Sequence, residues 1–217
     1  MLKLGVDAIT SSLSRVLCLG AHCDDIEIGC GGTVLKLLEA NPSVHVDWIV
    51  FSSTPERAAE AEGSARALLG DASANVVVKD FKERYFPYLG GEIKEYFDEL
   101  GATLSPDVVF THSAADSHQD HRVLSELAWN TFRNHLILEY EITKYDGDLG
   151  RPNAFVHLED AHCERKLSHL MEAFPSQRSK HWFSRDTFSS TLRLRGIESG
   201  SPSGHAEGFY CRKLVLA

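Results

Sequence analysis

The stretch LCLGAHCDDIEIGCGGTV, from Leu17 to Val34, joins an apolar run to a group of polar residues and then to glycines. Residues 15–20, which overlap its start, have the length and nearly continuous apolar character of a β-strand buried on both faces. One histidine and three acidic residues follow within six positions: His22, Asp24, Asp25 and Glu27. We interpret the stretch as a buried strand that ends in a polar loop, which is either a solvated turn or one half of a site.

Strand-like and helix-like segments alternate along the first 135 residues. The strand-like pattern recurs at residues 44–52, 74–80 and 107–112. Between and after these runs, apolar residues at helical spacing predict helices at residues 31–40, 55–70, 91–104 and 118–135. This alternation predicts an α/β fold, a three-layer Rossmann-like sandwich with a mostly parallel sheet and helices on both faces.

The pattern becomes less regular after residue 135. Residues 137–158 combine one expected strand with a loop that contains Gly and Pro, residues 163–174 are typical of a helix, and residues 206–216 are typical of a strand. Because no repeat or linker interrupts the chain, we expect one domain over residues 1–217, with residues 136–217 as a more irregular C-terminal elaboration.

Composition excludes several classes of partner. The net charge is −9, and no basic stripe is present to neutralise phosphates, which argues against nucleic-acid binding. No apolar segment approaches the roughly 18 residues that span a bilayer, and the first fifteen residues contain no run typical of a signal peptide. The five cysteines form no CxxC pair, so we expect reduced thiols in a cytoplasmic protein with a small-molecule partner.

A second polar segment, HSAADSHQDH at residues 112–121, follows the fourth predicted strand. Ligands of open α/β sheets gather beyond the carboxyl ends of the strands, so both polar segments are expected at one rim of the sheet. A catalytic zinc ion takes three protein ligands and leaves one position open. His22 and Asp25 are candidates from the first segment, and the histidines of the second segment are His112, His118 and His121. Asp24 then remains as a general base for a water whose pKa the metal lowers to about 7.

Both segments carry a resemblance to a known family. Residues 21–25 (AHCDD), with the glycines at 29, 31 and 32, resemble the AHPDD motif of the PIG-L/LmbE-like zinc-dependent N-deacetylases. Residues 118–121 (HQDH) resemble the second motif of that family, HPDH. Cys23 and Gln119 stand where the family usually has proline. The similarity extends from residue 15 to about residue 133.

The resemblance implies a role for each matching residue. The implied metal ligands are His22, Asp25 and His121. The implied catalytic residues are Asp24 as general base and His118, which polarises the oxyanion or protonates the departing amine and is oriented by Asp120. The implied metal is Zn²⁺, although another divalent ion such as Fe²⁺ would suit two histidines and one carboxylate.

Other polar residues are interpreted more simply. Arg57 and Glu60 match pocket residues of the family, but their spacing also suits a surface ion pair on a helix. His112 ends a strand and is left out of the ligand set. Ser113 and Asp116 are interpreted as loop residues, and Glu27 as a supporting residue at most. The sequence assigns no role to the later polar residues Lys144, Arg151, His181, His205 and Glu207.

The resemblance therefore implies a zinc-dependent hydrolase that removes an N-acyl group, with acetyl expected, from an amino sugar or sugar conjugate. Two alternatives stay open: a metal-independent nucleotide-binding Rossmann-like module, and a different metalloenzyme with a two-histidine, one-aspartate site. The substrate and the native metal are undetermined at this point. Homo-oligomerisation is open too, because the family commonly assembles.

Overall fold

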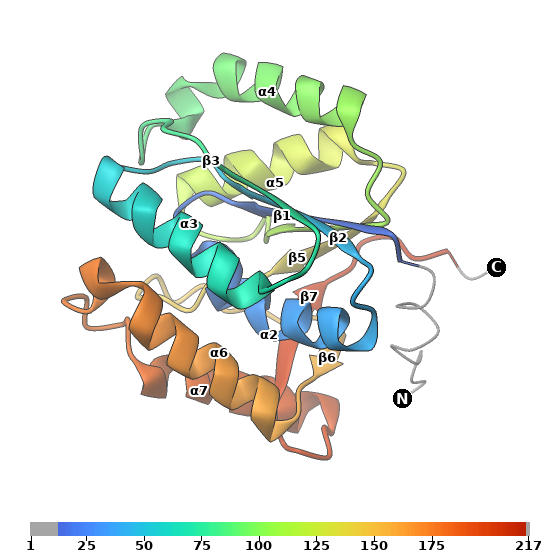
Figure 1. Ribbon diagram of the computed structural model, residues 1–217, viewed down its shortest axis with the longest axis vertical. Helices are drawn as coiled ribbons and strands as arrows, with labels where there is room; N and C mark the ends of the chain where they lie inside the picture. The colour runs from blue at the N-terminus through green and yellow to red at the C-terminus, as the bar shows by residue number, and fades with distance from the viewer. Residues whose placement is uncertain (1–12, 216–217) are drawn as a thin grey trace.

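The computed structural model describes residues 13–215 and contains a seven-stranded sheet with the strand order β3-β2-β1-β4-β5-β7-β6 (Figure 1). The strands are β1 (Arg15–Gly20), β2 (His45–Val50), β3 (Ala74–Val78), β4 (Val108–His112), β5 (Leu136–Tyr140), β6 (Ala154–His157) and β7 (Ala206–Tyr210). The α-helices are α2 (Asp25–Ala40), α3 (Pro55–Leu69), α4 (Gly90–Thr103), α5 (Gln119–Thr131), α6 (Asp160–Ala173) and α7 (Arg185–Ser199). Two short 3₁₀ helices are η1 (Phe86–Tyr88) and η2 (Pro175–Gln177).

Strands β1 to β5 pair in parallel, whereas β7 pairs antiparallel with both β5 and β6. The expected α/β fold with a mostly parallel sheet is confirmed. Strands β1 and β4 are neighbours in the sheet although the chain separates them by two strands. Their carboxyl ends therefore lie side by side, which brings the two polar segments to one rim.

The helices cover both faces of the sheet (Figure 1). Helices α2, α3, α6 and α7 lie on one face, and α4 and α5 lie on the other. Alternate residues of β1 serve the two cores, since Val16 and Cys18 pack with the first group and Leu17 and Leu19 with the second. Burial on both sides explains why this strand is apolar almost throughout.

Helix α2 begins earlier than the sequence pattern indicates. It starts at Asp25 and not at residue 31, so the glycines lie inside the helix. A Cβ atom on Gly29 would lie 2.2 Å from the ring of Tyr140, and one on Gly32 would lie 2.5 Å from Leu158. Glycine is therefore needed where the helix packs against its neighbours, and not to let the helix begin.

The C-terminal residues extend the same sheet. Residues 137–158, where one strand is expected, contain β6 and all but the first residue of β5, and β7 inserts between these two strands. Helix α7 is missing from the sequence prediction because its sequence, RDTFSSTLRLRGIES, is rich in Ser and Thr and its apolar periodicity is weak. Helix α5 ends at Thr131, four residues before its predicted end. Between residues 13 and 215 no helix has the length and apolar character that crossing a membrane requires.

Candidate active site

The first polar segment turns sharply between β1 and α2. The backbone N–H of His22 donates to Asp25 Oδ2 at 2.6 Å, so the carboxylate at the start of the helix closes the turn. Asp24 is the N-cap residue of α2. All three side chains are buried, which is unusual for residues of these types in a loop. A solvated acidic turn is therefore excluded.

The second segment contributes side chains from the opposite side. His118 is the N-cap of α5, and its Nδ1 accepts from the backbone N–H of Asp120 at 3.3 Å. An imidazole that accepts at Nδ1 carries its proton on Nε2 when it is neutral. His121 lies in the first turn of the helix, and its ring centroid is 5.0 Å from that of His22. The two motifs therefore meet, as the sequence predicts.

Three donor atoms converge at the centre of this site. His22 Nδ1 lies 3.1 Å from His121 Nε2 and 3.2 Å from Asp25 Oδ2, and the remaining distance, His121 Nε2 to Asp25 Oδ2, is 3.5 Å. Ligands at the usual zinc bond lengths of about 2.0–2.1 Å lie about 3.3 Å apart in tetrahedral geometry. The three atoms thus fit one small divalent ion without rearrangement.

Each of the two histidines also contacts a carboxylate through its other ring nitrogen. His22 Nε2 lies 3.3 Å from Asp120 Oδ2, and His121 Nδ1 lies 2.9 Å from Asp116 Oδ2. Histidines that bind metals usually carry such a partner, because it fixes the ring and leaves the second nitrogen free for the ion. This pattern supports a metal centre more strongly than the donor distances alone.

Two further histidines lie close to these donors. The donor atoms of His22, His118 and His121 lie within 4.8 Å of one another, and so do those of Asp25, His112 and His121. His112 is fully buried, and its Nε2 already accepts the backbone N–H of Ala21 at 3.0 Å. Its ring stacks on that of His121 with the centroids 3.8 Å apart. His112 therefore supports the site from behind, a contact that its position at a strand end does not reveal.

The charges of the buried groups are strongly coupled. Burial opposes a charge on His22, but the carboxylates of Asp25 and Asp120 prevail and raise its pKa to about 10. Burial and the neighbouring His112 lower the pKa of His121 to about 3. Although burial opposes ionisation of Asp25, the surrounding histidines hold its pKa well below the usual value. One positive charge is thus favoured among these ligands, and a divalent ion would displace the His22 proton.

Asp24 differs from its neighbour Asp25. Burial, together with the charge of Asp25, raises the pKa of Asp24. Its Oδ1 lies 3.3 Å from a guanidinium nitrogen of Arg57, whereas Oδ2 is buried with no hydrogen-bond partner among the described residues. A carboxylate with one held oxygen and one free oxygen is suited to accept a proton.

The resemblance implies that Asp120 orients His118, but in the structure the Asp120 carboxylate contacts His22. Its carboxylate contacts His22 and accepts from the backbone N–H groups of Arg84, at 2.6 Å, and Phe86, at 3.2 Å. Only its backbone N–H contacts His118. In this geometry the Asp120 side chain positions His22 and attaches the loop before η1 to the site.

Arg57 and Glu60 have separate partners. Arg57 joins Asp24 to Glu83, whose carboxylate lies 2.8 Å from it. Glu60, one turn later on α3, accepts the backbone N–H of Ser176 in η2 at 2.9 Å. Arg57 therefore reaches the candidate base, and Glu60 fixes the segment that follows α6.

Lys144 and Asp116 are connected to the site in a way that the sequence pattern misses. Lys144 Nζ lies 3.0 Å from Asp116 Oδ1, while the other oxygen of Asp116 faces His121. The position of Asp116, five residues before His121, would have allowed its contact with the site to be predicted from the sequence. The position of Lys144 would not, since only the pairing of β5 with β4 brings it near the site.

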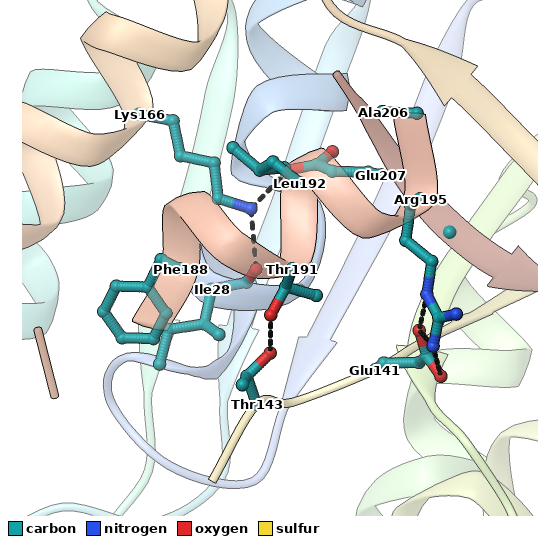
Figure 2. Close-up of a pocket in the computed structure, with 12 residues that line it drawn as sticks. Ile28, Glu141, Thr143, Lys166, Phe188, Thr191, Leu192, Arg195, Ala206 and Glu207 are labelled. Carbon is teal, nitrogen blue, oxygen red and sulfur yellow. Dashed lines mark hydrogen bonds and ion pairs between the residues drawn. The ribbon is translucent and has the colours of Figure 1, made fainter. Parts of the chain in front are cut away.

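A separate polar cavity lies between α2, α7 and β7 (Figure 2). Lys166 there donates to the Ile28 carbonyl at 2.7 Å and pairs with Glu207 at 2.5 Å. On the opposite wall Arg195 pairs with Glu141 at 2.9 Å. Because each cation is paired with an acid, we infer that these ion pairs hold the surrounding helices and strand together. We assign no ligand to the cavity.

Comparison with known proteins agrees with the geometry. The sequence model of the PIG-L family, described as GlcNAc-PI de-N-acetylase, matches residues 17–132, more than half of the chain. No curated protein sequence gives a significant match.

Several solved structures share the fold. N,N'-diacetylchitobiose deacetylase from Pyrococcus horikoshii is 21% identical, with 96% of this chain and 87% of that chain covered and a TM-score of 0.68. The 4-carboxy-2-hydroxymuconate hydratase GalB from Pseudomonas putida KT2440 is 15% identical, with 94% and 98% covered and a TM-score of 0.70. The zinc-inhibited form of the teicoplanin deacetylase Orf2 is 14% identical, with 91% and 97% covered and a TM-score of 0.68.

Proposed function

The chain belongs to the PIG-L family, and from that premise we propose that it hydrolyses the N-acyl group, specifically N-acetyl, of an amino sugar or sugar conjugate. The observation that carries the proposal is the cluster of His22, Asp25 and His121 donor atoms beside the unpaired oxygen of Asp24. Deacetylases of sugars and of teicoplanin among the structural neighbours support the same reaction class.

In this proposal the three donor residues hold a divalent ion, with Zn²⁺ expected and Fe²⁺ the alternative. Such an ion would polarise the acyl oxygen and would lower the pKa of a bound water to about 7. Asp24 accepts the proton of the attacking water through Oδ2, while Arg57 holds Oδ1. His118 donates from Nε2 to the oxygen that becomes negative as water attacks the acyl carbon. The C–N bond then breaks, the departing nitrogen takes the proton that Asp24 accepted from the water, and the products are the free amine and acetate.

The reaction is placed in the cytoplasm in this proposal. All five cysteines are free thiols in the structure, and four of them are buried. Unpaired thiols of this number are typical of a reducing compartment.

The deciding experiment is a screen of N-acetylated amino sugars for released amine, with the purified protein loaded with Zn²⁺ or Fe²⁺. Asp24→Asn is expected to lower kcat by about 10²- to 10⁴-fold, the usual contribution of general acid–base catalysis. Asp98→Asn, which alters an exposed carboxylate on α4, serves as the matched control and leaves kcat unchanged. Failure to bind any divalent ion, or full activity of the Asp24 variant, would overturn the proposal.

The rival functions make different predictions. A nucleotide-binding module needs glycines exposed to a phosphate, whereas Gly29 and Gly32 lie within α2 and face Tyr140 and Leu158. An iron oxygenase would consume oxygen, which an oxygen electrode detects. The structural likeness to a hydratase shows that the fold alone does not select the reaction, so the released amine is the essential readout.

A further inference from the structure

Two exposed aromatic rings stack on each other above the β5–β6 connection. Tyr145, which lies in that connection, is 71% exposed, and His181, which follows η2, is exposed as well. Their ring centroids are 6.0 Å apart, and their planes are inclined by 22°. The exposed Tyr85 and Tyr88 rings also contact each other, but their planes are inclined by 58°, so the nearly parallel arrangement and not exposure alone distinguishes the Tyr145–His181 pair.

Each of the two segments that carry the pair is linked to the candidate active site by a residue close in the chain. Lys144, the residue before Tyr145, contacts Asp116, which in turn contacts His121. On the other side, the segment leading to His181 begins at Ser176, which Glu60 fixes one turn of α3 away from Arg57. Tyr145 therefore follows a residue that is linked to the candidate ligand His121, and His181 follows a segment that is linked to the helix of Arg57.

The two chain segments that carry the Tyr145 and His181 rings are held in place by contacts with the rest of the protein. Lys144 Nζ contacts the carboxylates of Asp116, Asp146 and Asp148 at distances of 3.0, 3.3 and 2.7 Å. Two residues after His181, Phe183 is buried and packs against Phe188, with the ring centroids 5.2 Å apart. The rings are thus exposed on rigid supports, so little conformational entropy would be lost when a ligand covers them.

We propose that Tyr145 and His181 form an outer subsite that stacks against a second sugar ring, next to the ring that carries the N-acyl group. A pyranose ring has apolar C–H faces and a polar edge, so it matches an aromatic surface surrounded by charged side chains. Lys180, adjacent to His181, supplies a cation at this rim, and its charge contributes to the electrostatics of Asp24. The inference rests on the proposed function and adds to it two residues, Tyr145 and His181, that would recognise the part of a glycoside beyond the N-acylated sugar.

The test compares a mono- and a disaccharide of N-acetylglucosamine with the Zn²⁺-loaded protein. Tyr145→Ala is expected to lower kcat/KM for the disaccharide by about 3- to 10-fold, the usual strength of an aromatic stacking contact. The value for the monosaccharide should not change. Tyr145→Phe, which keeps the ring, is the matched control and retains the wild-type preference. His181→Ala should reproduce the loss, because it removes the second ring of the stack.

A binding experiment separates this inference from the proposed function. Calorimetric titration with the fully deacetylated disaccharide measures the subsite without catalysis. An equal kcat/KM for the disaccharide in the wild type and in Tyr145→Ala would contradict the proposed subsite and would not affect the proposed hydrolase activity. Tyr145-dependent disaccharide binding without amine release overturns the hydrolase and supports the subsite. Absence of both binding and hydrolysis overturns both proposals.

Discussion

The region up to residue 132 and the region after it contribute to the site in different ways. Every side chain proposed to touch the metal or the reacting atoms comes from the first region, at the ends of β1 and β4. The second region contributes buried cations that pair with acids. These pairs are Lys144–Asp116, Lys166–Glu207 and Arg195–Glu141. The chemistry is thus concentrated in two short segments, while the support comes from residues distant in sequence.

The Lys166–Glu207 pair shows how the support acts. The Glu207 carboxylate accepts the backbone N–H of Gly32 at 2.9 Å and that of Thr33 at 2.6 Å, both in the middle of α2. Lys166 in turn donates to Ile28, one turn earlier. The second region therefore holds the helix whose first residue, Asp25, is a candidate ligand. Changes in the second region should affect stability first and chemistry only through it.

The largest effect expected in the second region follows from Glu207→Gln. This change leaves Lys166 buried without a carboxylate, and losing one partner of a buried ion pair costs about 3–5 kcal/mol. Chemical denaturation should show the loss, whereas Asp98→Asn at the exposed Lys94 pair should change the free energy of unfolding by less than about 1 kcal/mol. If Glu207→Gln has the same free energy of unfolding as the wild type, the Lys166–Glu207 pair does not stabilise α2 in the way inferred here.

An effect of about 1–3 kcal/mol is expected from Gly29→Ala, because the added methyl group overlaps the Tyr140 ring. Tyr140 has little room to move, since its hydroxyl donates to the Leu19 carbonyl at 2.6 Å. Gly31→Ala in the same helix is the matched control. Its nearest neighbour would lie 3.6 Å away, so helix propensity should stabilise it by up to about 1 kcal/mol. A higher melting temperature for Gly29→Ala than for Gly31→Ala would contradict the close packing of Gly29 against Tyr140.

Lys144→Met tests whether the second region influences the proposed metal site. Removing the ammonium leaves Asp116 with one fewer partner, so the orientation of His121 is held less firmly. Loss of such an outer contact typically weakens metal binding by about 10- to 100-fold. Competition with a chromophoric chelator measures the affinity directly, and Lys94→Met provides an exposed lysine control. An affinity equal to that of the wild type would limit Lys144 to a structural role.

The smallest effect is expected at Asp107, an exposed acid of the first region whose carboxylate binds the backbone at the start of β1. Burial opposes its ionisation, but the backbone N–H groups of Ser14 and Arg15 donate to it and lower its pKa. Because the folded-state pKa is depressed, the stabilisation is present above the unfolded value of about 3.9 and is lost as pH falls through the folded value. Asp107→Asn should cost less than about 1 kcal/mol at pH 7, since the group is largely solvated. The difference between wild type and variant in urea titrations should shrink below pH 4, and a difference that grows there would refute the assignment.

The sequence predicts the sheet, the rim and the two motifs because these depend on local patterns. Apolar runs on both faces define the strands, and the His22 and His121 segments follow two of them. The roles assigned to the site residues stay predictions until they are tested by substitution. The start of α2 is misjudged because glycine has a low helix propensity, and only the closeness of Tyr140 and Leu158 explains why Gly29 and Gly32 lie inside the helix.

The sequence by itself determined the class of fold, the family and the residue types available for a metal and a base. The tertiary structure decided which acid faces which histidine: Asp120 faces His22, and Asp116 faces His121. It also decided that His112 contacts the candidate ligand His121, that Lys144 contacts Asp116 behind it, and that Tyr145 stacks on His181. These pairings depend on the order of strands in the sheet and on buried charges finding partners, and neither is encoded in any short segment of the chain.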